Sequence, residues 1–108
     1  MAFFNVNTRE AKEIVTGAQI RTFWGEQTLL SLVDIEPGVE VGLHTHPNEQ
    51  SGIILNGELE MGIGKEVKML SEGDVYIIPA GVEHYAKSYS TRAQVLDIFT
   101  PVREDYKY

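Results

Sequence analysis

The sequence predicts an all-β barrel made of short antiparallel strands. Short β-type runs recur along most of the chain, and residues that favour turns separate them. Helical periodicity is confined to residues 8–14, where we expect the only helix. This pattern is typical of a sandwich or small barrel, which can enclose a ligand cavity in its lumen.

The expected strands follow one another in order, with recognisable turn chemistry between them. Asn56-Gly57 is the strongest hairpin signal, because both residues tolerate the positive φ that a tight hairpin turn requires. Glu36-Pro37-Gly38 and Glu72-Gly73-Asp74 mark further turns. The strands are expected at residues 18–24, 28–36, 39–46, 50–55, 58–63, 67–70, 75–78, 84–88 and 93–99.

Length and composition limit the classes of function. The 108 residues match one ordinary domain, so we expect a single domain over residues 1–108. No segment approaches the ~20 apolar residues of a membrane span, and the N-terminus lacks the pattern of a secretory signal. We therefore expect a cytoplasmic protein without a membrane partner. The net charge of −7 disfavours nucleic acid, and the absence of cysteine restricts any metal site to nitrogen and oxygen ligands.

All three histidines of the chain fall in two of the expected strands. His44 and His46 are two residues apart, so on a strand both side chains point to the same face and form a chelating pair. His84 is the third. A single histidine on a barrel wall is more often a hydrogen-bonded packing residue, so the pattern around these three decides their interpretation.

That pattern resembles the cupin family. Residues 38–57 match the spacing of the first cupin motif, from Gly38 through the histidine pair and Gln50 to Gly57. Residues 73–88 match the second motif, with Ser88 where the family usually has Asn. The resemblance implies a cupin-type double-stranded β-helix, or jelly-roll barrel. It also implies a mononuclear metal site held by His44, His46, Gln50 and His84.

The residues themselves also favour Gln50 over Glu49 as the fourth ligand. Facing alternates along a strand, so only one of the two shares the lumen with Gly52 and Ile54, although a bulge would reverse the choice. Three neutral imidazoles and a neutral amide leave the charge of a divalent ion uncompensated, which makes the ion a stronger Lewis acid. We expect one divalent metal ion per chain, Zn, Ni, Mn or Fe.

Asp97 is the first candidate for acid–base chemistry. It shares one strand face with Val95 and Phe99. If that face lines the lumen, Asp97 can act as a general acid or base with Phe99 as an apolar wall. If the face points outward, Asp97 is an ordinary surface charge. Composition alone favours this second interpretation, because aspartate is rarely buried.

The C-terminal segment adds a second resemblance. Residues 97–106 look like the ending of small cupins similar to the pectin-degradation protein KdgF, which opens and ketonises 4,5-unsaturated uronates. The resemblance implies that Asp97, Phe99 and Arg103 belong to the site, with Arg103 holding a substrate carboxylate. Without the resemblance, we would expect Arg103 to form a salt bridge with Glu104, with Asp105 or with a partner subunit. We interpret Tyr76 and Tyr85 as core or interface residues, because aromatic residues in strands usually have that role.

Three classes of function follow from these observations. The first is a redox-neutral isomerase, lyase or cyclase acting on a small carboxylate-bearing substrate. The second is an iron-dependent dioxygenase, and the third is a non-catalytic cupin that binds a small molecule. Gln50, Asp97 and Arg103 favour the first class. We also expect a homodimer, because Leu43, Ile53 and Leu55 give the barrel an apolar outer face.

Overall fold

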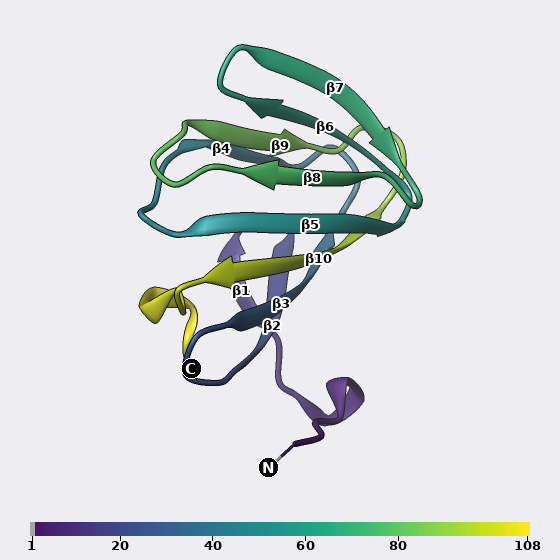
Figure 1. The fold of residues 1–108 in the computed structure, drawn as a ribbon. Helices are drawn as coiled ribbons and strands as arrows, with labels where there is room; N and C mark the ends of the chain where they lie inside the picture. Colours follow the sequence, from purple (N-terminus) through teal and green to yellow (C-terminus); the bar gives the residue numbers. More distant parts are fainter. Residues whose placement is uncertain (1) are drawn as a thin grey trace.

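Two antiparallel sheets face each other across the core (Figure 1). The computed structural model describes residues 2–108. The larger sheet has the strand order β1-β2-β3-β10-β5-β8, and the smaller has the order β4-β9-β6-β7. The predicted all-β jelly-roll barrel is confirmed. The strands are β1 Lys12–Val15, β2 Ala18–Trp24, β3 Leu29–Ile35, β4 Glu40–His44, β5 Glu49–Asn56, β6 Glu58–Ile63, β7 Glu66–Ser71, β8 Val75–Ile78, β9 His84–Lys87 and β10 Ala93–Thr100.

The core follows from strict alternation along the strands. In β10, every second residue from Ala93 to Phe99 is buried, and the residues between them are partly exposed. Ile54 on β5 and Leu59 on β6 are each only 1% exposed and pack in the same core cluster. Burying a side chain of this size contributes roughly 1.5–3 kcal/mol, so Ile54→Ala should cost about 2–5 kcal/mol with its cavity.

The prediction of a helix at residues 8–14 is wrong. The chain instead forms a short 3-10 helix, η1 Val6–Thr8, and then strand β1. β1 pairs with β2, with Lys12 opposite Ile20. A helix of seven residues is marginal in water, so sheet pairing outweighs the weak local periodicity. Across residues 2–108, no helix has the length and apolar character needed to cross a membrane.

The topology brings several strand ends to one end of the barrel (Figure 1). The connection between β4 and β5, the connection between β8 and β9, and the end of β10 all lie there. The side-chain amide of Asn48 donates to the carbonyl oxygen of Pro101 at 2.7 Å and ties the first connection to the segment after β10. A second short 3-10 helix, η2 Glu104–Tyr106, follows at the same end.

Ser88, the residue that departs from the second motif, has a structural role in the fold. It is fully buried at the end of β9. Its hydroxyl donates to the carbonyl oxygen of Glu36 at 2.6 Å and accepts from the backbone N–H of Val39 at 3.0 Å. The short side chain therefore satisfies the backbone where β3 leads into β4.

Candidate metal centre

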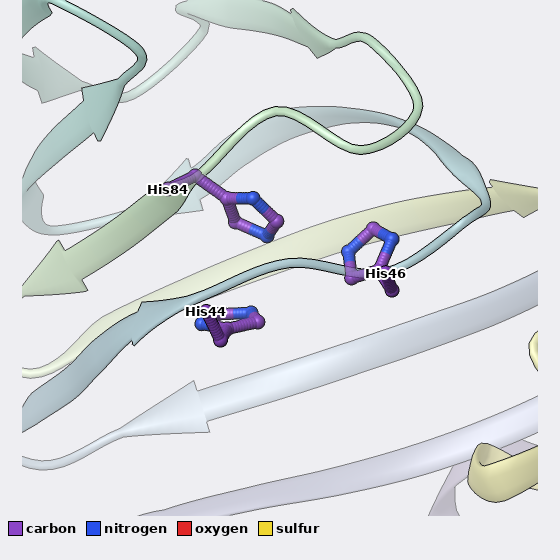
Figure 2. Close-up of side chains that lie close together, drawn as sticks. All are labelled: His44, His46 and His84. Carbon is purple, nitrogen blue, oxygen red and sulfur yellow. The ribbon is translucent and has the colours of Figure 1, made fainter.

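The three histidines converge at this end of the barrel (Figure 2). His44 is the last residue of β4, and His84 is the first residue of β9 directly opposite it. His46 lies two residues beyond β4, because the strand ends earlier than the predicted 39–46. One ring nitrogen from each histidine lies within 4.8 Å of the others. Three imidazole nitrogens gathered this closely could hold one metal ion after small side-chain movements.

Backbone carbonyl groups fix the orientation of all three rings. Nδ1 of His44 faces the carbonyl oxygen of Gly42 at 2.7 Å, and Nδ1 of His84 faces that of Val82 at 2.9 Å. His46 makes the equivalent contact to Asn48 at 3.0 Å. A nitrogen that faces a carbonyl oxygen carries the proton, so each Nε2 retains its lone pair. Metal-binding histidines are commonly held in this way.

The acceptor atoms at the centre fit a cation. His84 Nε2 is buried and has no hydrogen-bond partner within residues 2–108, which is costly for a polar atom. Gln50 Oε1 lies 2.9 Å from His46 Nε2, so two acceptors face each other at hydrogen-bond distance. A divalent ion would satisfy these acceptors together. Gln50 is 6% exposed whereas Glu49 is exposed, in agreement with the strand parity that favoured Gln50.

The electrostatics of the centre favour the neutral form of His46 and His84. Burial is the main reason that the pKa of the His84 ring is lowered to about 4; the hydrogen bond to the Val82 carbonyl group opposes this shift, and the charge of Arg103 adds to it. Burial also lowers the pKa of His46, although the Gln50 side-chain oxygen, which can accept a hydrogen bond only from the protonated ring, opposes the shift. At neutral pH the lone pairs of these two rings are therefore free of protons. Neutral imidazole is the form that binds a metal.

Asp97 points into the barrel, which decides between the two orientations that the sequence left open. It is 9% exposed and lines the same cavity as His44, Gln50 and His84. Burial raises the pKa of its carboxyl group to about 6, because the hydrogen bonds and the Arg103 charge that favour the carboxylate offset only part of the desolvation. A carboxyl group with this pKa can both accept and release a proton near neutral pH.

Phe99 and Arg103 complete this side of the cavity. The Phe99 ring is 1% exposed and packs edge-on against His46, with 5.4 Å between ring centroids. The guanidinium carbon of Arg103 lies over the Tyr106 ring, 3.7 Å from its centroid, and the Arg103 side chain is only 12% exposed. Its Nε donates to Asp105 at 3.1 Å. The expected salt bridge is thus present, and Arg103 nevertheless lines the cavity.

The available space has two parts. An inner cavity of about 50 Å³ lies between the sheets and holds only a few atoms. An outer groove of about 430 Å³ shares His44, Arg103 and Tyr106 with it and extends to Lys12 on β1. A sugar-sized molecule would therefore lie in the groove, and only its reacting end would reach the inner cavity.

Three residues of the site are absent from the sequence prediction. Tyr76 lines the cavity and donates its hydroxyl proton to Asp97 Oδ1, while Tyr106 carries Arg103. Gly52 lies between Tyr76 and Asp97 and leaves room for their contact. A signal for Gly52 was available, because a glycine inside a strand often marks a close approach. No comparable sequence signal distinguished Tyr76 and Tyr106 from aromatic residues that pack in the core.

The comparisons with known proteins agree with this fold. Residues 31–99 match the family described as the Cupin domain. Germin-like protein 5-1 of Oryza sativa subsp. japonica is 33% identical over 96 residues, which cover 80% of this chain and 43% of that protein. The chain spans less than half the length of the germin-like relatives that it matches.

Two solved structures are similar over almost the whole chain. An RmlC-like cupin from Shewanella frigidimarina has a TM-score of 0.93 at 24% identity and covers 99% of this chain and 96% of its own. KdgF from a Halomonas species has a TM-score of 0.91 at 24% identity and covers 99% of both chains. At this identity the likeness shows the fold, and together with the match over residues 31–99 it places the protein: the chain belongs to the cupin family.

Proposed function

We propose that this cupin is a metal-dependent, redox-neutral enzyme of the isomerase or lyase type, acting on a small carboxylate-bearing substrate such as a 4,5-unsaturated uronate. The observation that carries the proposal is the meeting of a buried carboxyl group, Asp97, and a largely buried guanidinium, Arg103, on the cavity lined by His44 and His84. Buried ionisable groups beside a cluster of metal-binding residues favour a functional site.

His44, His46, His84 and Gln50 would hold one divalent ion, Zn, Ni, Mn or Fe. When bound, the ion supplies Lewis acidity that polarises a substrate oxygen. The four side chains carry no negative charge at neutral pH, so they would leave the charge of the ion available to the substrate. The three histidines cluster without a carboxylate among them, which favours redox-neutral chemistry over an oxygenase of the two-His, one-carboxylate type.

Arg103 would bind the substrate carboxylate. Stacking on Tyr106 holds the guanidinium plane in place, and the bond from Nε to Asp105 fixes its rotation. The terminal nitrogens then offer the planar fork that matches a carboxylate. Because Arg103 lines both the inner cavity and the outer groove, it would orient the substrate at the boundary between them.

Asp97 would move the proton. Ketonisation of an enol removes a proton from the hydroxyl oxygen, turns the C–O bond into a carbonyl and forms a C–H bond at the other carbon of the C=C bond, so composition and overall oxidation state are unchanged. A carboxyl group with a pKa of about 6 can serve both half-steps. Phe99 would form the apolar wall that keeps water from this proton.

The uronate itself is proposed from likeness. The segment from Asp97 to Tyr106 resembles the ending of KdgF-like cupins, and the fold of KdgF is similar over 99% of both chains. The test is to follow a 4,5-unsaturated uronate by NMR with protein loaded with each of the four metals, while oxygen consumption is recorded. Conversion without oxygen uptake is expected. Oxygen uptake would favour the dioxygenase, and no turnover would favour a binding protein.

We further propose that the chain pairs with a second copy through the outer face of the six-stranded sheet. Leu30, Ile53, Val75 and Ile77 lie on its outward positions, and Val75 and Ile77 are 71% and 64% exposed. An apolar sheet face of this kind is unusual on a monomer. Leu43, which the sequence grouped with Ile53, lies on β4 in the other sheet and cannot belong to this face.

Light scattering tests the pairing. Ile77→Lys should give a monomer, because the charge would be buried without a partner. Leu43→Lys is the matched control, since Leu43 is also 64% exposed but lies on the other sheet, and this variant should remain a dimer. A monomeric unmodified protein at micromolar concentration would contradict the pairing.

A further inference from the structure

A row of three facing residues crosses the six-stranded sheet beside the metal centre. Asp97 on β10 lies opposite Gly52 on β5, and Gly52 lies opposite Tyr76 on β8. All three are on the inner face, where Tyr76 is 8% and Asp97 is 9% exposed. Asp97 and Tyr76 are thus two strands apart, roughly 10 Å between backbones, a span that a tyrosine side chain can bridge.

Gly52 is the residue that makes this contact possible. A Cβ at position 52 would overlap both the Tyr76 hydroxyl group and Oδ1 of Asp97. The backbone there needs no glycine, because Gly52 is absent from the residues with positive φ. Glycine inside a strand weakens it, and here the only evident compensation is the space it leaves for Tyr76 to pass.

We propose that Tyr76 is a positioning residue for Asp97, and that Gly52 provides the gap through which its hydroxyl group reaches the carboxylate. The hydroxyl donates to Asp97 Oδ1 inside the barrel. This bond occupies Oδ1, so a proton exchanged with the substrate would pass through Oδ2. Hydrogen bonds to an ionised carboxylate are strong and directional, so the bond fixes the carboxylate plane.

The alternative for Tyr76 is a purely structural role. Its ring packs in the core cluster with Ile54 and Ile78, and that packing does not require the hydroxyl group. Tyr76→Phe keeps the ring and removes only the hydrogen bond, so it separates the two roles. The positioning role rests on the proposed function, because it assumes that Asp97 moves a proton.

The first measurement needs no activity. In zinc-loaded protein at pH 8, the Tyr76 hydroxyl proton should give a downfield, slowly exchanging NMR resonance. Tyr76→Phe and Gly52→Ala should both lose it. Tyr89→Phe, which removes an exposed hydroxyl group bonded to Glu60 at 2.8 Å, should keep it. Absence of the resonance from the unmodified protein, or its persistence in Tyr76→Phe, would overturn the proposal.

The second measurement is kinetic. Tyr76→Phe should retain its metal and keep KM within about twofold, but lower kcat by about 10–100-fold, because a misplaced catalytic group costs about this much. Adding Tyr76→Phe to Asp97→Asn should change kcat by less than about twofold, since Tyr76 acts only through Asp97. If Tyr76 had only a structural role, Tyr76→Phe would lower kcat by the same factor in the unmodified protein and in Asp97→Asn.

The outcomes separate the two proposals. Equal losses in both backgrounds, or a kcat of Tyr76→Phe within twofold of the unmodified protein, would overturn the positioning role. No conversion of the uronate by the unmodified protein would instead reject the proposed function. In that case the NMR measurement still decides whether Tyr76 holds Asp97. Should Gly52→Ala not fold, Tyr76→Phe alone carries both measurements.

Discussion

The candidate site has two halves that the fold builds in different ways. The metal-binding half comes mainly from the four-stranded sheet and its connections, where His44 and His84 face each other across neighbouring strands. The proton-handling half comes from the six-stranded sheet, where Tyr76 reaches Asp97 across a glycine. The first depends on the short spacing from His44 to His46 and on the pairing of β4 with β9, and the second depends on the register of three strands.

The two halves therefore differ in the structural changes that they tolerate. Each histidine ring is fixed locally, by a carbonyl group two residues away in the chain. Asp97 is fixed by a residue 21 positions away, so a slip of one residue in the pairing of β5 or β8 would lose the contact. The metal-binding half should therefore survive changes in the sheet that disable the proton-handling half.

The largest expected effect is the loss of the metal in His84→Ala. Removing one imidazole opens the site to water, and metal affinity should fall by more than the ~10–100-fold of an outer-shell change. Elemental analysis after dialysis measures it. Tyr89→Phe, an exposed position five residues along the chain, serves as the control. Full metal occupancy in His84→Ala would reject the assignment of His84 as a ligand.

The substitution Asp97→Asn tests the proton-handling half. It should keep the fold and the metal and lower turnover by roughly 10²–10⁴-fold, the range for a lost general acid or base. Asp34→Asn is the matched control, because Asp34 is also 9% exposed but pairs with Arg21 and Arg92. It should lower the melting temperature and leave turnover per folded molecule unchanged. Equal turnover in Asp97→Asn and the unmodified protein would remove Asp97 from the mechanism.

The two halves also differ in how far the sequence predicts them. Strand alternation predicts the all-β fold and places His44 and His46 on one face, and the resemblance to the two cupin motifs adds His84 to them, which the pairing of β4 with β9 bears out. Strand parity likewise predicted that Gln50 and not Glu49 faces inward. The inward orientation of Asp97 stayed open, because alternation shows which residues share a face but not which face meets the core. Tyr76 was missed, since its contact depends on the pairing of β5 with β8, which no local pattern reveals.

The N-terminal segment is a second place where strand pairing could not be predicted from the local sequence pattern. Local periodicity favoured a helix at residues 8–14, yet β1 forms there by pairing with β2. The strand is partly exposed and offers little alternation to read. Position at a sheet edge therefore decided its structure, and the outer groove beside Lys12 could not be predicted from the sequence.

A smaller effect is expected for Arg103→Lys. The lysine keeps the charge but loses the planar fork and the stacking on Tyr106. KM for a carboxylate substrate should rise about tenfold, and kcat should fall by less than about threefold, because the lost contact serves binding in the ground state as well. Arg92→Lys is the control, because the Arg92 side chain is 54% exposed and pairs with Asp34 away from the cavity. A fall in kcat with unchanged KM would place Arg103 in the chemical step instead.

The smallest expected effect concerns Asn48, which joins the two halves. Its backbone carbonyl holds the His46 ring, and its side-chain amide donates to Pro101, two residues before Arg103. Asn48→Ala keeps the first contact and removes the second, a buried hydrogen bond worth about 1 kcal/mol. The melting temperature should fall by roughly 4–8 °C, and metal affinity should change by less than about tenfold. Asn7→Ala, at an exposed position, should change neither quantity. Thermal unfolding and a metal titration on the same samples measure both, and unchanged values in Asn48→Ala would mean that the connection bearing His46 and the segment bearing Arg103 are held independently.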